Sequence, residues 1–228
     1  MLRINIVSFL SSLLLLAACS SDKSTQNQDI KDSLNVGAKT TEQTSDKKNI
    51  LFFGTSLTAG YGLDPTEAYP ALIQQKIDSL KLPYKVINGG LSGETSAAGK
   101  SRIDWLLKQP VAIFVLELGA NDGLRGIAVK ETIANLQAII DKVKAKNSDV
   151  KLVMEGMQMP PNMGETYTTE FKAIFKDLAN KNEMVYVPFL LEGVAGVPKL
   201  NLGDGIHPTA KGHQILAENV WVVLKDEL

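Results

Sequence analysis

Ser56 is the first residue of this sequence that could do chemistry, because it follows the end of a short apolar segment. Residues 50–53 are Ile, Leu, Phe and Phe, a run typical of a buried strand, and Gly54 lets the backbone turn sharply after them. We therefore expect Ser56 at the carboxyl end of a first strand, where open α/β sheets bind ligands. A serine there can be a nucleophile if a base and an oxyanion site lie nearby, and it can equally cap a helix.

His207 is the candidate for that base. It lies in residues 203–208, Gly-Asp-Gly-Ile-His-Pro, where the glycines and the proline predict a tight turn ahead of the last helix. An acid three residues before a histidine, here Asp204, can bring its carboxylate to Nδ1, hold the tautomer and stabilise the imidazolium. A histidine beside a capping acid is the structural alternative. The other histidine, His213, is predicted to be a surface residue of the last helix.

Two further loops carry residues that could donate hydrogen bonds to an oxyanion. Gly93 lies in the glycine-containing loop 89–95, and glycine can expose its backbone N–H to a ligand at close range. Asn121 follows the predominantly apolar run 112–118 and offers a side-chain N–H donor. Each loop taken alone could also be an ordinary turn with a helix cap.

Strand-like and helix-like segments alternate through the rest of the chain. The predicted strands are residues 49–53, 84–88, 112–118, 151–155 and 185–188, and the predicted helices are 67–81, 95–107, 129–146, 167–180 and 209–224. In the helix 129–146, the residues Ile133, Leu136, Ile140 and Val143 are expected on the buried face. This alternation predicts a three-layer α/β/α fold with a flavodoxin-like, parallel five-stranded sheet. The loops that hold Ser56, Gly93 and Asn121 would then meet at one edge of the sheet.

Together these loops resemble, in order, four sequence blocks of the SGNH (GDSL) hydrolase family. The matching blocks are Gly54-Thr55-Ser56-Leu57, Ser92-Gly93-Glu94-Thr95, Gly119-Ala120-Asn121-Asp122 and Asp204-Gly205-Ile206-His207-Pro208. The resemblance spans residues 49–225. Within the family, the chain most resembles the periplasmic thioesterase, lysophospholipase and arylesterase subgroup. Each block alone is unspecific, whereas the ordered set is highly specific.

The resemblance implies a role for each matched residue. Ser56 would be the nucleophile, His207 the general base and then acid, and Asp204 the residue that orients His207. The backbone N–H groups of Ser56 and Gly93 and the side chain of Asn121 would form the oxyanion hole, and no metal or organic cofactor is implied. One position departs from the family pattern, because its usual Asp before the serine is Thr55 here. This departure leaves open which groups support the turn that carries the nucleophile.

The implied reaction is hydrolysis of an acyl or aryl carboxylic ester, a lysophospholipid or a thioester through an acyl-serine. A carbohydrate O-deacetylase and a non-catalytic, tethered binding module are the alternatives. Methionines at 154, 157, 159 and 163 could line an acyl groove or pack in the core. We expect a monomer that takes a small-molecule ester or lipid, and the net charge of −1 predicts no nucleic-acid partner.

The N-terminal region predicts export. Residues 1–18 contain Arg3, an apolar run and a small-residue end, which together indicate a signal peptide, and residues 16–19 resemble the lipobox of bacterial lipoproteins. Cys19 would then carry lipid, although an ordinary secretory signal with an incidental cysteine is the alternative. Residues 19–48 are polar and predict a flexible tether, and residues 49–228 form the hydrolase domain. The predicted location is the bacterial cell envelope, with the lipid holding the chain at a membrane.

Overall fold

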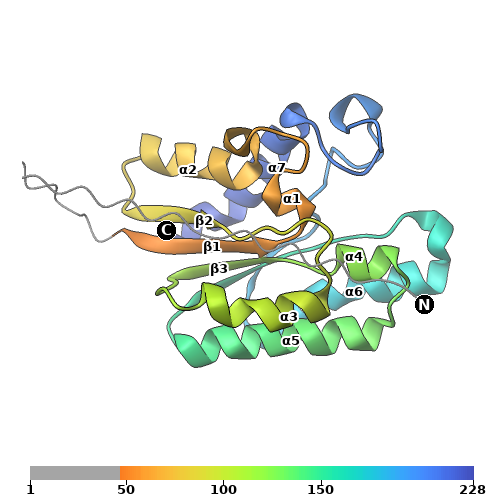
Figure 1. Ribbon diagram of the computed structural model, residues 1–228, viewed down its shortest axis with the longest axis horizontal. Coiled ribbons are helices and arrows are strands. Elements are labelled where there is room, and N and C mark those ends of the chain that lie inside the picture. The colour runs from red at the N-terminus through yellow and green to blue at the C-terminus, as the bar shows by residue number, and fades with distance from the viewer. Residues whose placement is uncertain (1–46) are drawn as a thin grey trace, which may run out of the picture. The chain divides into compact units, whose positions relative to one another are not determined.

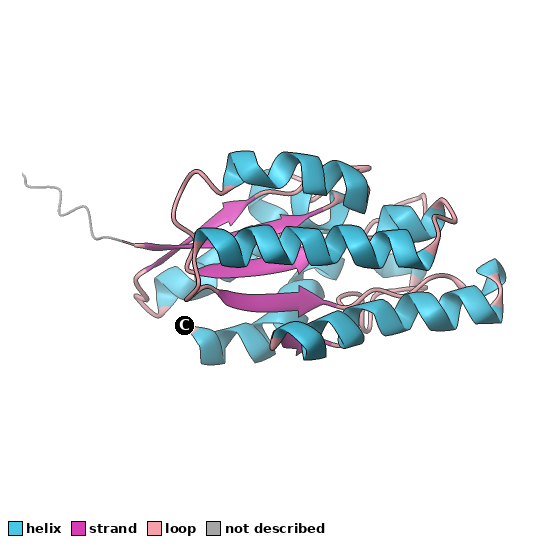
Figure 2. Cartoon of the chain, turned by 90° about the horizontal axis from the view of Figure 1, so that it is seen from below, coloured by secondary structure: helices cyan, strands magenta, loops and turns pink. Residues whose placement is uncertain are grey.

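The computed structural model describes residues 47–228, and the predicted signal peptide, Cys19 and all but the last two residues of the tether lie outside these residues. One parallel sheet of five strands has the order β2-β1-β3-β4-β5. The strands are β1 (Lys48–Gly54), β2 (Tyr84–Asn88), β3 (Ile113–Glu117), β4 (Lys151–Glu155) and β5 (Val185–Val187). This order is that of flavodoxin-like folds, so the predicted sheet is confirmed. Figure 2 shows the strand arrows running in a common direction.

Helices cover both faces of the sheet, which makes the predicted three layers (Figure 1). Helices α2 and α7 pack against each other on one face, and α5 packs against α3 and α6 on the other. The helices are α1 (Ser56–Ala59), α2 (Tyr69–Ser79), α3 (Ser96–Leu106), α4 (Ala120–Leu124), α5 (Val129–Lys146), α6 (Glu165–Asn182) and α7 (Ala210–Leu224), with short 3₁₀ turns at Pro65–Glu67, Pro161–Met163, Pro198–Leu200 and Lys225–Glu227. No helix among residues 47–228 is long and apolar enough to cross a bilayer.

The central strands supply the core because their side chains are buried on both faces of the sheet. Phe52 meets the Tyr69 ring of α2 edge to face, with centroids 5.6 Å apart. The next residue, Phe53, packs on Phe114 of β3 at 5.9 Å. Alternating residues of one strand therefore serve opposite layers. Such burial on both sides explains why these strands read as continuous apolar runs in the sequence.

Helix α5 corrects one prediction about the buried face. Ile133 remains exposed, and Thr132 takes the core-facing position in the first turn of the helix. Thr132 Oγ1 lies 3.4 Å from the Asp122 carboxylate, and a Cβ on Gly119 would lie 3.3 Å from the Thr132 methyl group. A small polar side chain is needed there because the loop after β3 lies directly against the helix.

Candidate active site

Three predicted residues lie in series at the carboxyl edge of the sheet. Ser56 is the first residue of α1, directly after β1, and His207 lies in the loop before α7. The distance from His207 Nε2 to Ser56 Oγ is 3.0 Å. On the other side of the ring, His207 Nδ1 lies 2.7 Å from Asp204 Oδ2. A hydroxyl, an imidazole and a carboxylate in this order can activate the hydroxyl as a nucleophile.

Asp204 is exposed, yet it is well supplied with hydrogen-bond donors. Its Oδ1 accepts the backbone N–H groups of Ile206 and His207, each at 3.0 Å, while Oδ2 faces the imidazole. The bond with the His207 side chain, followed by the backbone bonds, lowers the pKa of Asp204 to about 2. The carboxylate therefore stays ionised at neutral pH and holds the proton on Nδ1, which leaves Nε2 as the acceptor that faces Ser56.

The His207 loop is braced by its own backbone. Leu202 N–H donates to the His207 carbonyl at 2.7 Å, and Gly205 N–H donates to the Leu202 carbonyl at 2.9 Å. Gly205 has a φ of +76°, which favours glycine at this turn. The Tyr61 ring covers the imidazole of His207, with centroids 4.5 Å apart. These contacts restrict the ring of His207 from the backbone side and from one face.

The turn that holds Ser56 is supported by a buried acid from the neighbouring strand. Glu117, the last residue of β3, accepts the Thr55 backbone N–H at 2.7 Å. The Thr55 hydroxyl lies 3.0 Å from both carboxylate oxygens of Glu117, and it makes no capping bond to α1. Thr55, which replaces the Asp of the family pattern, therefore serves as a donor to Glu117. This answers which groups support the turn.

The candidate oxyanion donors come from three neighbouring loops. The backbone N–H groups of Ser56 and Gly93 have no hydrogen-bond acceptor among residues 47–228. Gly93 adopts a φ of +79°, and the Arg125 guanidinium donates twice to its carbonyl, at 3.2 Å. Asn121 Nδ2 donates to the Glu94 carbonyl at 3.1 Å, so the same amide group has a second N–H to offer. The loops after β2 and β3 are thereby tied to each other.

The loop after β3 is also anchored below the site. Asp122 is buried and accepts the backbone N–H of Ser96, the first residue of α3, at 2.7 Å. Glu94 is buried as well and forms a two-pronged ion pair with Arg102. The guanidinium of Arg102 lies over the Phe53 ring, 4.5 Å from its centroid. Acidic residues of the second and third sequence blocks thus hold the loops that carry Gly93 and Asn121.

The structure also bears on two predictions outside the Ser56–His207–Asp204 series. His213 is almost fully buried, and its Nδ1 accepts the Tyr69 backbone N–H at 3.1 Å, so its predicted surface position was wrong. Helix α7 lies against α2, and the polar neighbours of His213 in sequence hid this contact. The methionines at 154, 157 and 159 are buried in the core, and Met159 packs against Gly123 of α4. Packing explains these three methionines better than a groove does.

Sequence reasoning missed a set of buried polar residues beneath Ser56. Glu117 and Glu155 are fully buried, as is Tyr69, whose hydroxyl lies between Thr58 and Glu155. No motif marked them. The available signal was an acid that closes each of two apolar strands, because a charged residue at the end of a buried run needs a partner.

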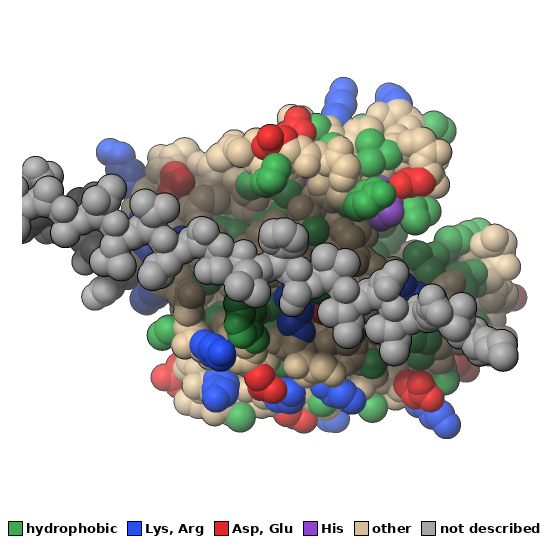
Figure 3. All heavy atoms as spheres, in the orientation of Figure 1, with side chains coloured by type: hydrophobic (Ala, Val, Ile, Leu, Met, Phe, Trp, Pro, Cys, Tyr) green, Lys and Arg blue, Asp and Glu red, His purple; other side chains and the backbone are tan. Residues whose placement is uncertain are grey.

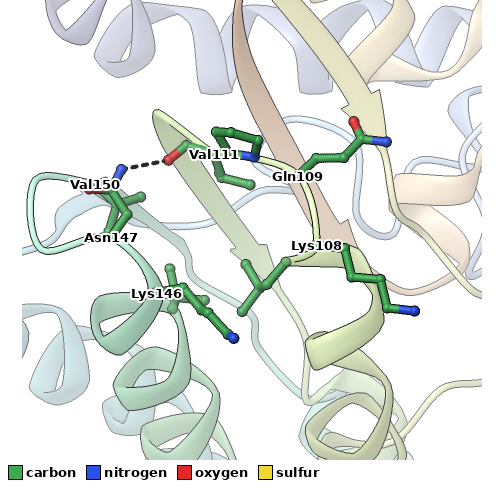
Figure 4. A pocket seen from close by; sticks show the side chains of 9 residues that line it. Lys108, Gln109, Val111, Lys146, Asn147 and Val150 are labelled. Atoms are coloured by element: carbon green, nitrogen blue, oxygen red, sulfur yellow. Dashed lines mark hydrogen bonds between the residues drawn. The ribbon is translucent and has the colours of Figure 1, made fainter.

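A pocket among the described residues lies at the opposite, amino-terminal edge of the sheet (Figure 4). Its walls include Lys108 and Val111 before β3, and Lys146 and Asn147 at the end of α5. Asn147 Nδ2 donates to the Val111 carbonyl across it at 3.0 Å. None of Ser56, His207 and Asp204 lines this pocket, so the pocket is not part of the candidate site.

The fold and the Ser56–His207–Asp204 series are those of a serine hydrolase. Residues 52–215 match the GDSL-like Lipase/Acylhydrolase family. Esterase TesA of Pseudomonas aeruginosa is 39% identical over 179 residues, which cover 78% of this chain and 88% of that protein. Thioesterase 1/protease 1/lysophospholipase L1 of Escherichia coli K12 is 38% identical over 170 residues, covering 74% and 79% of the two chains.

Comparison with a solved structure indicates the same family. The crystal structure of TesA aligns with a TM-score of 0.76 at 38% identity, and the match covers 79% of this chain and all of that one. This chain belongs to the GDSL-like lipase/acylhydrolase family, and it is a serine ester hydrolase.

Proposed function

We propose that Ser56 is the nucleophile, His207 the general base and then acid, and Asp204 the residue that orients His207. The observation that carries this assignment is the unbroken series of hydrogen bonds from Ser56 Oγ to the Asp204 carboxylate. His207 takes the proton of Ser56 as Oγ attacks the ester carbonyl, and it returns that proton to the leaving alkoxide. The acyl-serine is then hydrolysed by a water that the same imidazole activates.

The oxyanion of each tetrahedral intermediate is met by the N–H groups of Ser56 and Gly93 and by Asn121 Nδ2. Two observations support this. The two backbone groups have no other acceptor among residues 47–228, and Asn121 keeps one N–H free while the other donates to the Glu94 carbonyl. Donors held in advance stabilise developing charge without reorganisation during the reaction.

The substrate is an ester with an apolar acyl or aryl group. Each of the four segments that carry site residues also carries, within a few positions, one large, exposed apolar side chain. These residues are Tyr61, Leu91, Leu124 and Ile206, each between 45% and 51% exposed. Figure 3 shows hydrophobic side chains beside a histidine on this face. An apolar rim favours acyl chains, lysophospholipids and thioesters over the polar sugars that an O-deacetylase would bind.

We further propose that the chain is exported and anchored at the bacterial envelope by lipid on Cys19. The sequence around residues 16–19 is the support for this, and it lies outside the described residues. Labelling of expressing cells with a clickable palmitate analogue tests the anchor. Wild type should be labelled and a Cys19→Ser variant should not, and equal labelling of both would refute it.

The catalytic assignment is tested with a fluorophosphonate probe and a series of p-nitrophenyl esters from acetate to palmitate. Wild type should be labelled and should prefer acyl chains longer than acetate, whereas Ser56→Ala should be folded, unlabelled and inactive. Activity confined to acetate and to acetylated sugars would favour the deacetylase. An unlabelled, folded wild type would favour the binding module.

A further inference from the structure

Two carboxyl groups lie buried behind the Ser56 turn, and the catalytic series does not use either of them. Glu117 ends β3 and Glu155 ends the adjacent strand β4. Both side chains are fully buried, and neither forms an ion pair with a cation of residues 47–228. Two buried negative charges without a cation would be strongly destabilising, so the protonation of these acids needs an explanation.

Glu117 is surrounded by donors that belong to the nucleophile turn. Its Oε2 accepts the backbone N–H groups of Thr55 at 2.7 Å and of Thr58 at 3.3 Å. The hydroxyls of both threonines point to it as well, at 3.0 and 2.9 Å. A Cβ on Gly54 would collide with Glu117 and Thr58, so only glycine allows this close approach. Such a set of donors satisfies an ionised carboxylate and no other form so well.

Glu155 has the opposite surroundings. One of its oxygens lies 2.9 Å from the Tyr69 hydroxyl, and the other, Oε1, has no hydrogen-bond partner. An ionised Glu155 would therefore be a buried charge with a single donor. A protonated Glu155 can instead donate its carboxyl proton to the Tyr69 oxygen, so that this buried proton has a hydrogen-bond acceptor.

The groups between the two acids form a continuous chain of hydroxyls. The Tyr69 hydroxyl lies 3.0 Å from Thr58 Oγ1, which lies 2.9 Å from Glu117 Oε2. With Glu155 protonated, each hydroxyl donates to the next group in one direction: Glu155 to Tyr69, Tyr69 to Thr58, and Thr58 to Glu117. With both acids ionised, the single Tyr69 proton would have to serve Glu155, and Thr58 would lose its donor.

A further titratable group beside these hydroxyls is His213 on α7, whose ring stacks on Tyr69. Burial lowers the pKa of His213 to about 4, so it is neutral and adds no cation. Burial raises the pKa of Glu117 to about 7 against the opposing effect of its donors. The pKa of Glu155 is raised well above its usual value, first by burial and then by the charge of Glu117. Glu117 is therefore the acid that ionises first.

We propose that Glu117, as a carboxylate, is a positioning residue that holds the Ser56 turn, and that Glu155 is its protonated partner, so that the pair carries one negative charge. The positioning part rests on Ser56 being the nucleophile. Because Glu117 holds the N–H groups of Thr55 and Thr58, it sets the backbone on both sides of Ser56. Thr55 fits this arrangement because an Asp there would add a third buried carboxyl.

Matched Glu→Gln substitutions separate the two roles. Glu117→Gln replaces a carboxylate that accepts several hydrogen bonds by an amide. The NH₂ group of this amide cannot accept from the Thr55 and Thr58 donors. We expect kcat/KM and the rate constant of fluorophosphonate labelling to fall together by roughly 10–100-fold, because the Ser56 turn shifts. Glu155→Gln keeps a neutral donor toward Tyr69, so both rates should stay close to wild type.

A titration of labelled sites distinguishes positioning from mere structural damage. In Glu117→Gln, all sites should still be labelled at the end of the reaction, but more slowly than in wild type. Structural damage would instead leave a fraction of the sites unlabelled, while the intact sites react at the wild-type rate. If Glu117→Gln does not fold, Thr55→Val removes one donor to Glu117 and should slow labelling by about 2–10-fold. Unchanged labelling in Thr55→Val, or equal losses in the two Gln variants, would overturn the positioning role.

The proton on Glu155 has a readout that needs no activity. Infrared spectra of the full chain at pH 8 should contain the C=O band of a buried protonated carboxyl group, and Glu155→Gln should abolish it. Persistence of the band in Glu155→Gln would overturn the assignment. Failure of wild type to react with the fluorophosphonate would refute the proposed function, while this spectrum would still decide the protonation of Glu155.

Discussion

Ser56 lies between two acids that differ in almost every physical respect. Asp204 is exposed, and its hydrogen bonds with the His207 side chain and then with the backbone of its own loop lower its pKa to about 2. Glu117 is buried, and burial raises its pKa to about 7 although four donor groups oppose the shift. Hydrogen bonds dominate at the exposed acid because water already solvates it, whereas desolvation dominates at the buried acid.

The two acids therefore suit different tasks. Asp204 is ionised throughout the neutral range, so it can stabilise a positive imidazole during each proton transfer. Glu117 faces the backbone of the nucleophile turn and makes no bond to Ser56 Oγ or to His207, so it can act only through the position of the backbone. This comparison suggests that proton transfer and nucleophile placement are carried by separate carboxylates on opposite sides of Ser56.

The largest expected effect comes from the exposed acid. Asp204→Asn would present an amide to His207 Nδ1 and favour the wrong tautomer, so kcat should fall by on the order of 10³–10⁴. Steady-state kinetics with a p-nitrophenyl ester measures this, with Asp226→Asn in the terminal turn as an exposed control. A loss no larger than that of Glu117→Gln would break the proposed division between the two acids.

A substitution that leaves both acids in place provides a reference for the effects of changing either acid. Asn121→Ala removes one proposed oxyanion donor, and kcat should fall by roughly 10²–10³, the usual scale for such a group. Because the pKa values of both acids are untouched, the shape of the pH–rate profile should match wild type. Wild-type kcat in this variant would rule out the role of Asn121, and Asn180→Ala at an exposed position of α6 serves as the matched control.

The smallest effect is on stability. A buried acid with a raised pKa binds more protons when folded than when unfolded, so its contribution is complete below the usual value near 4.5 and is lost as the pH rises. Each unit of pKa difference corresponds to about 1.4 kcal/mol of unfolding free energy. Urea unfolding of wild type should show stability falling from about pH 4.5 through pH 7 and beyond, because the folded protein keeps protons on Glu117 and Glu155 that the unfolded chain has lost.

The Glu155→Gln variant should show a shallower decline below about pH 7 and no further decline above it, because Glu155 contributes to the slope from its usual value near 4.5 upward. Its stability should fall until Glu117 ionises and then level off above about pH 7. Continued loss at higher pH, parallel to wild type, would show that Glu155 is not the acid that titrates there. The comparison of the two curves tests the order in which the acids ionise.

Most of the fold could be read from the sequence because its signals are local. The strand 84–88, the helix 129–146 and the strand 151–155 were predicted with the bounds that the structure has. Apolar periodicity and flanking turn residues act over a few positions, so they survive in the linear sequence. The short helices α1 and α4 were missed, since four or five residues are too few to show a period.

The chemical groups of the site follow from the amino-acid sequence alone: one serine after a strand, one Asp-x-x-His turn, and loops with Gly93 and Asn121. The sequence also predicted that parallel strands would bring the loops after β1, β2 and β3 to one edge. The packing of the fold, by contrast, places Glu117 against Thr55 and connects Glu155 to Glu117 through the hydroxyls of Tyr69 and Thr58. These residues are far apart in the chain and belong to no common motif. Their interaction exists because packing removes them from water and leaves each polar group only the partners that the fold brings near.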